Sequence, residues 1–358
     1  MNWGELITLE YGKPVKDKES TDGKIPVYGT NGQIGTSHLP AQCKHPSFIL
    51  GRKGAYRGVH YSDCPFSVID TAFYAEPLTD RIDLKWAYYK FLTYDINGMD
   101  SGSAIPSTDR YQIYSIEVEV PPLEEQRKIV AVLDCIDRKI NINQKVNDNL
   151  EQQAAALFSS LYNRSNTEVR YTDLIQILGG GTPKTGETAY WNGNIAFFTP
   201  KDVGTPYTFI TEKTITEEGL SHCNSRLYPV NTVFVTARGT VGKVGLSGVP
   251  MAMNQSCYAL VGKETHQLLV YFYTLKAVDR LKHKASGAVF DAITTRDFDS
   301  EQIMKLSDDD AKAFLCVAEP MFQEILNNGI ENLQLSTLRD FLLPKLMSGE
   351  IDVSSVQL

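Results

Sequence analysis

Two long segments of the chain carry apolar residues at alternating intervals of four and three positions, the spacing of a coiled-coil seam. The first segment begins near Leu123, directly after Pro121 and Pro122, which are tolerated at a helix start. The seam positions in this segment are Ile129, Leu133, Ile136, Ile140, Asn143, Asn147, Leu150, Ala154, Leu157 and Leu161. The pattern predicts one long helix with two asparagines inside an otherwise apolar stripe.

The second segment repeats the first at an offset of 185 residues, which relates Ile129 to Phe314. The repeated seam positions are Phe314, Ala318, Met321, Ile325, Asn328, Asn332, Leu335, Arg339, Leu342 and Leu346. The same offset relates Ser101-Gly102 to Ser286-Gly287 and, less closely, Arg52-Lys53-Gly54 to Ala237-Arg238-Gly239. The repeat therefore predicts that a whole structural unit is duplicated.

A long amphipathic helix cannot bury its stripe alone, and antiparallel pairing of the two copies is the simplest closed arrangement. In that arrangement paired residue numbers sum to 475, so Asn143 meets Asn332 and Asn147 meets Asn328. A buried amide facing leucine would cost about 1–3 kcal/mol, so the asparagines select this register. Arg339 would face Ile136 and is expected to extend outward, and Pro320 is expected to start or kink the second helix. The alternative is that each helix packs only on its own globule.

The expected fold class is α/β, with two mixed α/β globular domains joined by two long antiparallel coiled-coil helices in a pseudo-two-fold internal repeat. Short apolar runs at 47–50, 68–73 and 232–235 predict strands, and residues 268–281 predict a helix. The predicted boundaries are 1–120 for the first globule, 121–164 for the central helical spacer, 165–305 for the second globule, 306–350 for the distal helical spacer and 351–358 for a C-terminal tail.

Composition and motifs exclude several classes of protein. The chain has no apolar run long enough for a membrane span and no signal-like start, so we expect a cytoplasmic protein without a membrane partner. Its six cysteines are scattered without C-x-x-C spacing, so neither a metal site nor a disulfide is expected. The run from Gly179 to Lys184 lacks phosphate-loop spacing and is interpreted as a loop whose backbone approaches another segment closely. No catalytic constellation is found, so the chain is predicted to be a binding protein and not an enzyme.

Positive charge concentrates in Gly- and Thr-containing loops, although 35 Lys and Arg against 43 Asp and Glu leave a net charge of −8. These loops are 52–58, 238–243 and 282–284. Arg and Lys neutralise phosphates, and Gly lets backbone amides approach them. A single such loop is more often a solvated hairpin. Two such loops separated by a helix about 50 Å long, however, suit a DNA duplex. The length of that helix is comparable with one to two turns of DNA, each about 34 Å.

The run Val120-Pro121-Pro122-Leu123-Glu124-Glu125-Gln126-Arg127-Lys128-Ile129-Val130-Ala131-Val132-Leu133-Asp134 strongly resembles the central region of type I restriction-modification specificity subunits. Segments 180–183, 190–191, 237–244 and 254–255 look like a second target-recognition domain of that family, and 338–342 with 348–351 look like its distal region. In the first globule, Tyr11-Gly12-Lys13-Pro14 replaces the Gly-Gly-Thr-Pro run, and the distal helix lacks the Pro-Pro-Leu-Glu-Glu-Gln run.

The resemblance implies a non-catalytic, sequence-specific DNA-binding subunit that reads a bipartite target in double-stranded DNA. It also implies two methyltransferase (M) subunits and restriction (R) subunits as partners. The chain itself would bind no cofactor, with S-adenosylmethionine, ATP and Mg on the partner subunits. A coiled-coil adaptor and a DNA-modifying enzyme with an unrecognised active site remain the alternatives. We expect DNA contacts from Arg52, Lys53, Tyr56, Arg57, Thr182, Lys184, Lys201, Arg238, Thr240, Lys243, Lys282 and Lys284.

Overall fold

The computed structural model describes residues 1–99, 106–204, 206–284 and 292–356. The chain divides into two compact units, of which unit 1 comprises Met1–Arg138 with Ser336–Leu358 and unit 2 comprises Lys139–Leu335. Each unit therefore contains one globule and part of both long helices. The matching dipeptides Ser101-Gly102 and Ser286-Gly287 lie outside the described residues.

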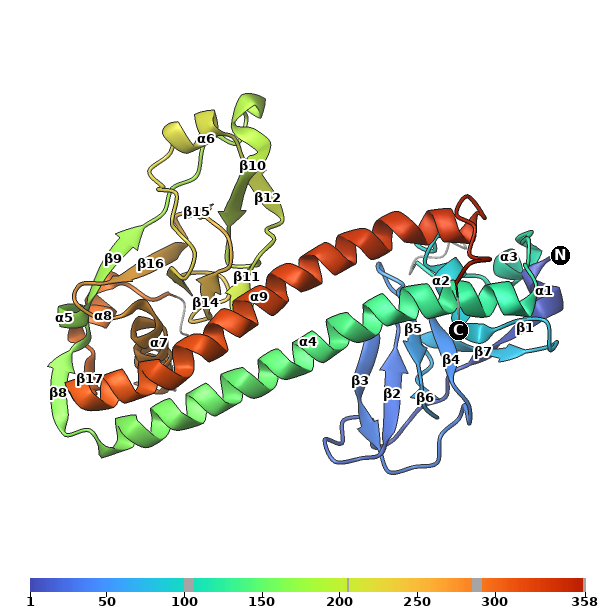
Figure 1. Cartoon of the computed structure of the whole chain (residues 1–358), viewed down its shortest axis with the longest axis horizontal. Helices are drawn as coiled ribbons and strands as arrows, with labels where there is room; N and C mark the ends of the chain where they lie inside the picture. Colours follow the sequence, from blue (N-terminus) through green and yellow to red (C-terminus); the bar gives the residue numbers. More distant parts are fainter. Residues whose placement is uncertain (100–105, 205, 285–291, 357–358) are drawn as a thin grey trace. The chain divides into compact units, whose positions relative to one another are not determined.

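The two long helices are α4 (Leu123–Arg164) and α9 (Asp308–Met347), shown in Figure 1. Helix α9 begins where the hydroxyl of Ser307 accepts a hydrogen bond of 3.1 Å from the amide of Asp310. Three aspartates in its first turn also favour a helix start, because they lie at the positive end of the helix dipole. The expectation that Pro320 starts this helix is therefore wrong, since the cap at Ser307 starts it earlier.

Hydrogen bonds between asparagine side chains fix the register of the helices in unit 2. The Asn143 amide donates to Asn332 Oδ1 over 2.9 Å, and the Asn328 amide donates to Asn147 Oδ1 over 2.9 Å. Residue numbers rise along one helix as their partners fall along the other, so the pairing is antiparallel. Every predicted seam residue is buried or half-buried. The predicted antiparallel pairing and its register are confirmed.

The helices of unit 1 pack on each other and on the globule in one core. Ile129 and Leu133 of α4 share this core with Leu343 and Leu346 of α9, and with Trp86 of the globule. The side chain of Arg339 does not simply extend into solvent as expected. Its Nη1 atom lies 3.1 Å from the carboxylate of Asp137 on α4, which supplies a partner for the charge.

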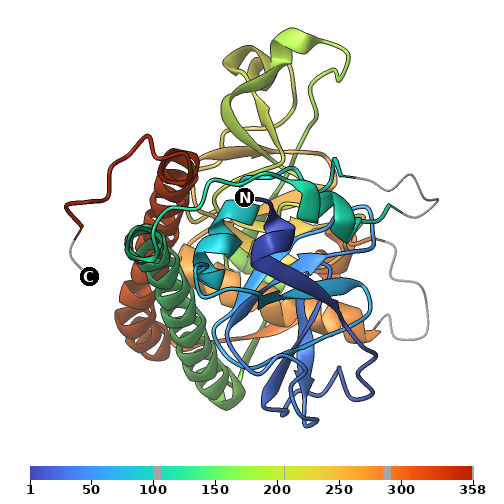
Figure 2. The ribbon, with the colours of Figure 1, turned by 90° about the vertical axis from the view of Figure 1, so that its right-hand side faces the viewer.

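The globule of unit 1 is built on a four-stranded antiparallel sheet of order β1-β7-β4-β5. A second sheet has the order β3-β2-β6, and α1 contacts α3 (Figure 2). The predicted strand 47–50 is confirmed as β4, whereas the predicted strand 68–73 is interrupted by a turn between β6 and β7. The elements are α1 (Trp3–Leu6), β1 (Ile7–Tyr11), β2 (Ile25–Gly29), β3 (Gly32–Ser37), β4 (Ser47–Gly51), β5 (Val59–Ser62), β6 (Ser67–Val68), β7 (Ala72–Pro77), α2 (Leu84–Phe91) and α3 (Arg110–Ser115).

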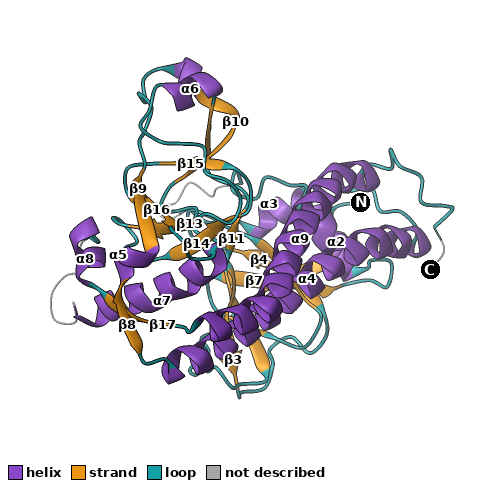
Figure 3. Cartoon of the chain, turned by 60° about the vertical axis from the view of Figure 1, so that its left-hand side comes forward, coloured by secondary structure: helices purple, strands orange, loops and turns teal. Residues whose placement is uncertain are grey.

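The globule of unit 2 contains a five-stranded sheet of order β11-β14-β13-β16-β9, against which helix α7 packs (Figure 3). Smaller sheets have the orders β12-β10-β15 and β17-β8. The predicted strand 232–235 and the predicted helix 268–281 are confirmed as β13 and α7. The elements are β8 (Thr167–Arg170), α5 (Tyr171–Leu174), β9 (Ile175–Gly179), the 3-10 turn η1 (Thr188–Tyr190), β10 (Trp191–Phe198), β11 (Tyr207–Thr208), β12 (Lys213–Ile215), α6 (Glu217–Ser221), β13 (Val233–Thr236), β14 (Val244–Ser247), β15 (Met251–Met253), β16 (Cys257–Gly262), α7 (Gln267–Lys284), α8 (Thr295–Ser300) and β17 (Gln302–Lys305).

The two globules repeat each other residue by residue within their main sheets. Gly51 pairs with Ala72 in unit 1, and Thr236 pairs with Cys257 in unit 2, at the offset of 185 seen in the sequence. Helices α3 and α8 obey the same offset at both ends. At the start of each globule the offset is 168, which relates Ile7 to Ile175. The offset grows from 168 to 185 between these points, so the extra residues of the second globule lie between β9 and β13.

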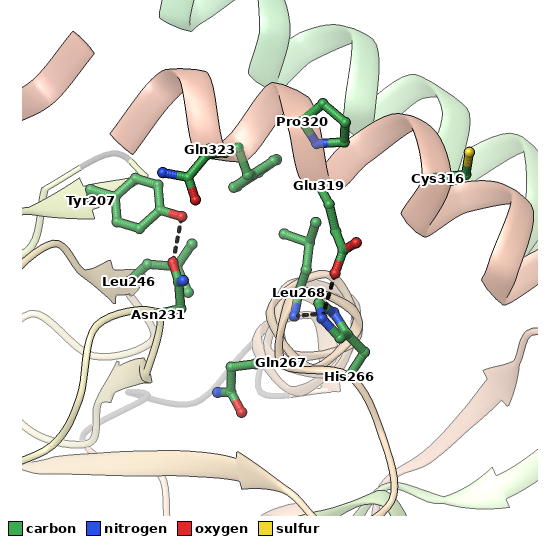
Figure 4. A pocket seen from close by; sticks show the side chains of 11 residues that line it. Tyr207, Asn231, Leu246, His266, Gln267, Leu268, Cys316, Glu319, Pro320 and Gln323 are labelled. Carbon is green, nitrogen blue, oxygen red and sulfur yellow. Dashed lines mark hydrogen bonds and ion pairs between the residues drawn. The ribbon is translucent and has the colours of Figure 1, made fainter. Parts of the chain in front are cut away.

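Helix α7 is tied to α9 beside a cavity of about 450 Å³ in unit 2 (Figure 4). His266 Nε2 lies 2.6 Å from a carboxylate oxygen of Glu319, and the Tyr207 hydroxyl donates to Asn231 Oδ1 over 2.6 Å. The contact between His266 and Glu319 joins the globule to the long helix, whereas the bond between Tyr207 and Asn231 lies within the globule. In the described ranges, no helix is both long enough and apolar enough to cross a membrane.

Candidate nucleic-acid interface

The basic turn of unit 1 follows strand β4 and is held by backbone hydrogen bonds. The amides of Arg52 and Lys53 both donate to the carbonyl of Thr71, over 2.8 and 3.1 Å. The carbonyl of Arg52 accepts a hydrogen bond of 2.9 Å from the amide of Thr108. Gly54 completes the turn with a φ of +124°, a conformation that disfavours side chains. Backbone hydrogen bonds therefore hold this turn, and the Arg52 guanidinium adds one side-chain bond of 3.1 Å to the carbonyl of Asp70.

The turn after β13 in unit 2 has the same hydrogen bonds at the same offset. The amides of Ala237 and Arg238 both donate to the carbonyl of Ser256, over 2.8 and 3.2 Å. The carbonyl of Ala237 accepts from the amide of Ile293 over 2.9 Å, and Gly239 has a φ of +81°. The loose sequence match between these two turns is therefore a close structural equivalence.

A glycine beside each turn allows two backbone segments to approach closely. A Cβ atom at Gly180 would clash with the carbonyl oxygens of Met253 and Asn254. A Cβ atom at Gly12 would clash with the carbonyl oxygens at the equivalent positions, Val68 and Ile69. The predicted close approach of the glycine loop is confirmed, and the Tyr11–Pro14 segment takes the place of this loop in unit 1.

Several loops of unit 2 meet around the turn at Arg238. The Thr240 hydroxyl donates to the carbonyl of Pro200 over 3.0 Å, and the Thr182 hydroxyl bonds the side chain of Gln255. Lys282 reaches the turn from α7, because a Cβ atom at Gly242 would clash with its side chain. The loops enclose a cavity of about 450 Å³ that is lined by Thr199, Pro200, Lys201, Glu212, Lys213, Gly239, Thr240 and Asn254.

Most of the predicted contact residues of unit 2 are exposed on these loops or, for Lys282, on helix α7. They are Thr182, Lys184, Lys201, Arg238, Thr240, Lys243 and Lys282. The expectation of a loop at 282–284 is wrong, because these residues form the last turn of α7. The charge of Lys201 is partly offset, since its Nζ lies 3.6 Å from the carboxylate of Glu212. The Thr182 and Thr240 hydroxyls already donate hydrogen bonds within the protein, so their oxygens remain as acceptors. The surface can therefore bind phosphates through Lys and Arg and read base edges through Thr and Asn.

Two of the predicted contact residues are used inside the protein. Arg57 is 2% exposed, and its Nη2 donates to the carbonyls of Ile96 and Asn97 over 3.2 and 2.7 Å. Lys284 Nζ lies 2.5 Å from Glu301, a fully buried carboxylate that also pairs with Arg280. The sequence shows the charge of both residues, but it shows neither the burial of Arg57 nor the buried partner of Lys284, whose own side chain is 55% exposed.

The structure also reveals an aromatic and cationic cluster in unit 1 that the sequence did not indicate. The ring of Tyr11 lies 4.7 Å from the guanidinium carbon of Arg52 and 4.9 Å from that of Arg110. The hydrogen bond to the Tyr111 hydroxyl raises the pKa of Arg110. Tyr11, Tyr56 and Tyr111 are exposed by 42%, 62% and 65%. Stacked guanidinium and phenol groups of this kind bind bases and phosphates.

In the described part of the chain, one group of side chains has ligand atoms close enough to share a metal ion, namely Cys43, His45 and Glu76. None of these three residues belongs to the predicted DNA contacts.

Comparisons with known proteins place this arrangement in a family. A family model described as the type I restriction modification DNA specificity domain matches residues 2–152 and 163–305. The chain is 23% identical to the type I restriction enzyme HindI specificity subunit of Haemophilus influenzae, over 74% of both proteins. It is 27% identical to the EcoR124I/EcoR124II specificity subunit of Escherichia coli, over 66% of this chain and 67% of that subunit.

A shorter and more similar match is the MjaIX specificity subunit of Methanocaldococcus jannaschii, which is 32% identical over 33% of this chain and 29% of that subunit. Among solved structures, the type I restriction-modification S subunit from M. genitalium has the same fold, with a TM-score of 0.62 and 17% identity. The superposition covers 97% of this chain and 95% of that one.

The family model covers both globules and most of the first long helix, and it matches the chain twice, as the duplicated turns do. The family is a DNA-specificity component, which agrees with the expectation of a non-catalytic chain that binds neither S-adenosylmethionine nor ATP itself. The chain belongs to the type I restriction-modification specificity subunit family.

Proposed function

We propose that the two globules are target-recognition domains that each read one half of a bipartite sequence in double-stranded DNA. The paired helices α4 and α9 would set the distance between the two halves. The domain boundaries of this proposal are those predicted from the sequence. The target-recognition domains are residues 1–120 and 165–305, and the helical spacers are residues 121–164 and 306–350.

The observation that carries the proposal is the duplicated turn that follows β4 and β13. Each turn presents a basic residue, Lys53 or Arg238, at the same position of the same backbone frame. A protein that bound one continuous patch would need only one such turn. Two copies on one chain suit a ligand whose phosphate backbone repeats along its length, so that each turn can contact it at a separate place. Duplex DNA has this property.

The partners follow from the family. The helices and their flanking regions would dock two methyltransferase subunits, which bind S-adenosylmethionine, and restriction subunits that use ATP and Mg would join them. The complex would work in the cytoplasm, where it meets chromosomal and incoming DNA. A methyltransferase extrudes its target base at a cost of a few kcal/mol, so firm binding by the specificity subunit supports the reaction.

The binding test uses the full chain assembled with its methyltransferase subunits, and it starts from the methylated motif in host DNA. A duplex with that motif is titrated at several salt concentrations against wild type and R238A/K243A complexes. Each lost phosphate contact lowers the slope of log K against log salt by about 0.9, so the double variant should lose about 1–2 in slope. Its affinity should fall for cognate and unrelated DNA alike.

The matched control is K263A/K312A, which also removes two positive charges from unit 2. Lys263 and Lys312 line a different cavity, beyond the Gly262 end of strand β16. This variant should keep the wild-type slope. Equal slopes for wild type and R238A/K243A would contradict the site. A wild-type complex that fails to shift any duplex would instead favour the adaptor alternative.

A further inference from the structure

Cys43, His45 and Glu76 form a cluster in unit 1 that the DNA-binding role does not use. Their ligand atoms all lie within 4.8 Å of one another. His45 Nε2 is 2.7 Å from Glu76 Oε2 and 3.8 Å from Cys43 Sγ. Cys43 and His45 lie in the irregular segment before β4, whereas Glu76 lies on β7. The cluster thus joins a loop to the end of strand β7.

We propose that these three side chains bind one divalent transition-metal ion of the zinc type, with water as a fourth ligand. A thiolate, an imidazole and a carboxylate form a ligand set that suits zinc. Zinc–ligand bonds of about 2.3 Å to sulfur and about 2.0–2.1 Å to nitrogen place tetrahedral sulfur and nitrogen ligands about 3.5 Å apart. The observed 3.8 Å between Sγ and Nε2 is close to that spacing. Tetrahedral nitrogen and oxygen ligands of zinc lie about 3.4 Å apart, so the Glu76 carboxylate needs to move about 0.7 Å away from Nε2 to admit the ion.

The imidazole of His45 is oriented as metal-binding imidazoles are. Its Nδ1 lies 3.0 Å from the carbonyl oxygen of Pro46, so Nδ1–H donates to that carbonyl and the other nitrogen faces the cluster. A hydrogen bond from the distant ring nitrogen to a backbone carbonyl is the usual second contact of a histidine ligand. Binding of the ion releases the thiol proton of Cys43 and any proton that Nε2 shares with Glu76.

The surroundings give both rigidity and access. Cys43 is fully buried, and its backbone exchanges two hydrogen bonds of 3.0 Å with Phe66. The side chains of His45 and Glu76 are 38% and 34% exposed, so solvent reaches the side of the cluster where the fourth ligand would bind. The ion would fasten the irregular segment before β4 to β7 and has no role in a reaction.

The second copy of the fold shows that the fold itself does not require these side chains. Tyr228 exchanges the same pair of backbone hydrogen bonds with Met251 that Cys43 exchanges with Phe66. The positions equivalent to His45 and Glu76 are Val230 and Val261. The second globule therefore has valine at both positions where the first globule has a side chain that can bind an ion. The proposed ligand set is confined to the first globule. The sequence reading missed the cluster because a lone C-x-H spacing is weak and the third ligand follows 31 residues later.

The test is a titration of the metal-free full chain with Co²⁺, followed by displacement with Zn²⁺. One equivalent of Co²⁺ should give sulfur-to-cobalt charge-transfer absorption and the d–d bands of a four-coordinate site. His45→Gln and Glu76→Gln should each weaken Co²⁺ binding at least tenfold, and Cys43→Ser should abolish the charge-transfer band. Zn²⁺ should raise the Tm of wild type but not that of His45→Gln.

The matched control is Cys64→Ser, which removes an exposed cysteine of the same unit and should leave the titration unchanged. If Cys43→Ser does not fold, the His45 and Glu76 variants still decide the outcome, because their side chains are partly exposed. The proposal is overturned if wild type shows no charge-transfer band. It is equally overturned if His45→Gln binds Co²⁺ as tightly as wild type, which would place the ion elsewhere.

Discussion

Replacing Asn328 by leucine tests whether the asparagine pairs hold the helices in register. Asn328 is 7% exposed, and its amide donates to Asn147 Oδ1 over 2.9 Å across the helix pair of unit 2. Leucine has the same number and branching of side-chain heavy atoms, although its methyl groups are bulkier, so the variant removes one partner of the hydrogen bond with little change in side-chain shape. The Asn147 amide would then face an apolar side chain.

The expected cost follows from that geometry. A buried amide without a partner loses about 1–3 kcal/mol, and Asn147 is half-buried, so the lower half of that range applies. Asn147→Leu alone should cost a similar amount. The double variant N147L/N328L places leucine against leucine, as at a normal coiled-coil seam, so it should regain most of the loss. The double-mutant cycle should give a coupling of about 2–3 kcal/mol.

The assay is urea unfolding of wild type, both single variants and the double variant, followed by the helical circular dichroism signal. For a unit of about 200 residues, each kcal/mol also moves Tm by about 2–4 °C, which gives an independent reading. If the double variant is destabilised by the sum of the two single losses, the amides do not bond each other. The asparagine pairs would then not set the register of the helices.

Two further changes test parts of unit 2. Gly180→Ala should cost about 1–3 kcal/mol because its Cβ would meet two carbonyl oxygens, whereas Gly179→Ala, which meets open space, should cost far less in the same thermal unfolding measurement. Burial raises the pKa of Glu151, so its contribution to stability is present below the ordinary carboxyl pKa and is lost as pH rises through the raised value. Glu151→Gln should therefore be more stable than wild type at neutral pH and should lose this pH dependence, and a variant whose stability follows wild type across that range would contradict this assignment.

The long helices and their pairing could be predicted because one repeated pattern encodes them. The seam, its two asparagines and the offset of 185 residues all lie in the linear sequence, and together they allow a single antiparallel register. The role of Pro320 as a helix start was misjudged, since α9 begins at the Ser307 cap, close to the predicted boundary at residue 306. A proline inside a helix gives a strong local signal, but three aspartates and a serine cap outweigh it.

The candidate interface could be predicted only in part. The turns at Lys53 and Arg238 were found because they repeat. The contact between Tyr11 and Arg110 was missed because these residues are far apart in sequence and meet only after β1 and α3 pack in the same globule. Arg57 is a charged residue in a Gly-containing loop, and nothing in that local pattern reveals that carbonyls of residues 96–97 bind its guanidinium.

The repeat shows that the backbone structure of the two turns is shared, whereas the side chains on that backbone differ. Backbone hydrogen bonds to Thr71 and Ser256 hold the two turns in the same shape, although Arg52 of the first turn corresponds to Ala237 of the second. Because the frame does not depend on those side chains, they can differ without loss of fold. We therefore expect the two halves of the DNA target to differ in sequence. Mapping of methylated adenines in host DNA would show this directly, and a target whose halves are inverted copies of each other would contradict it.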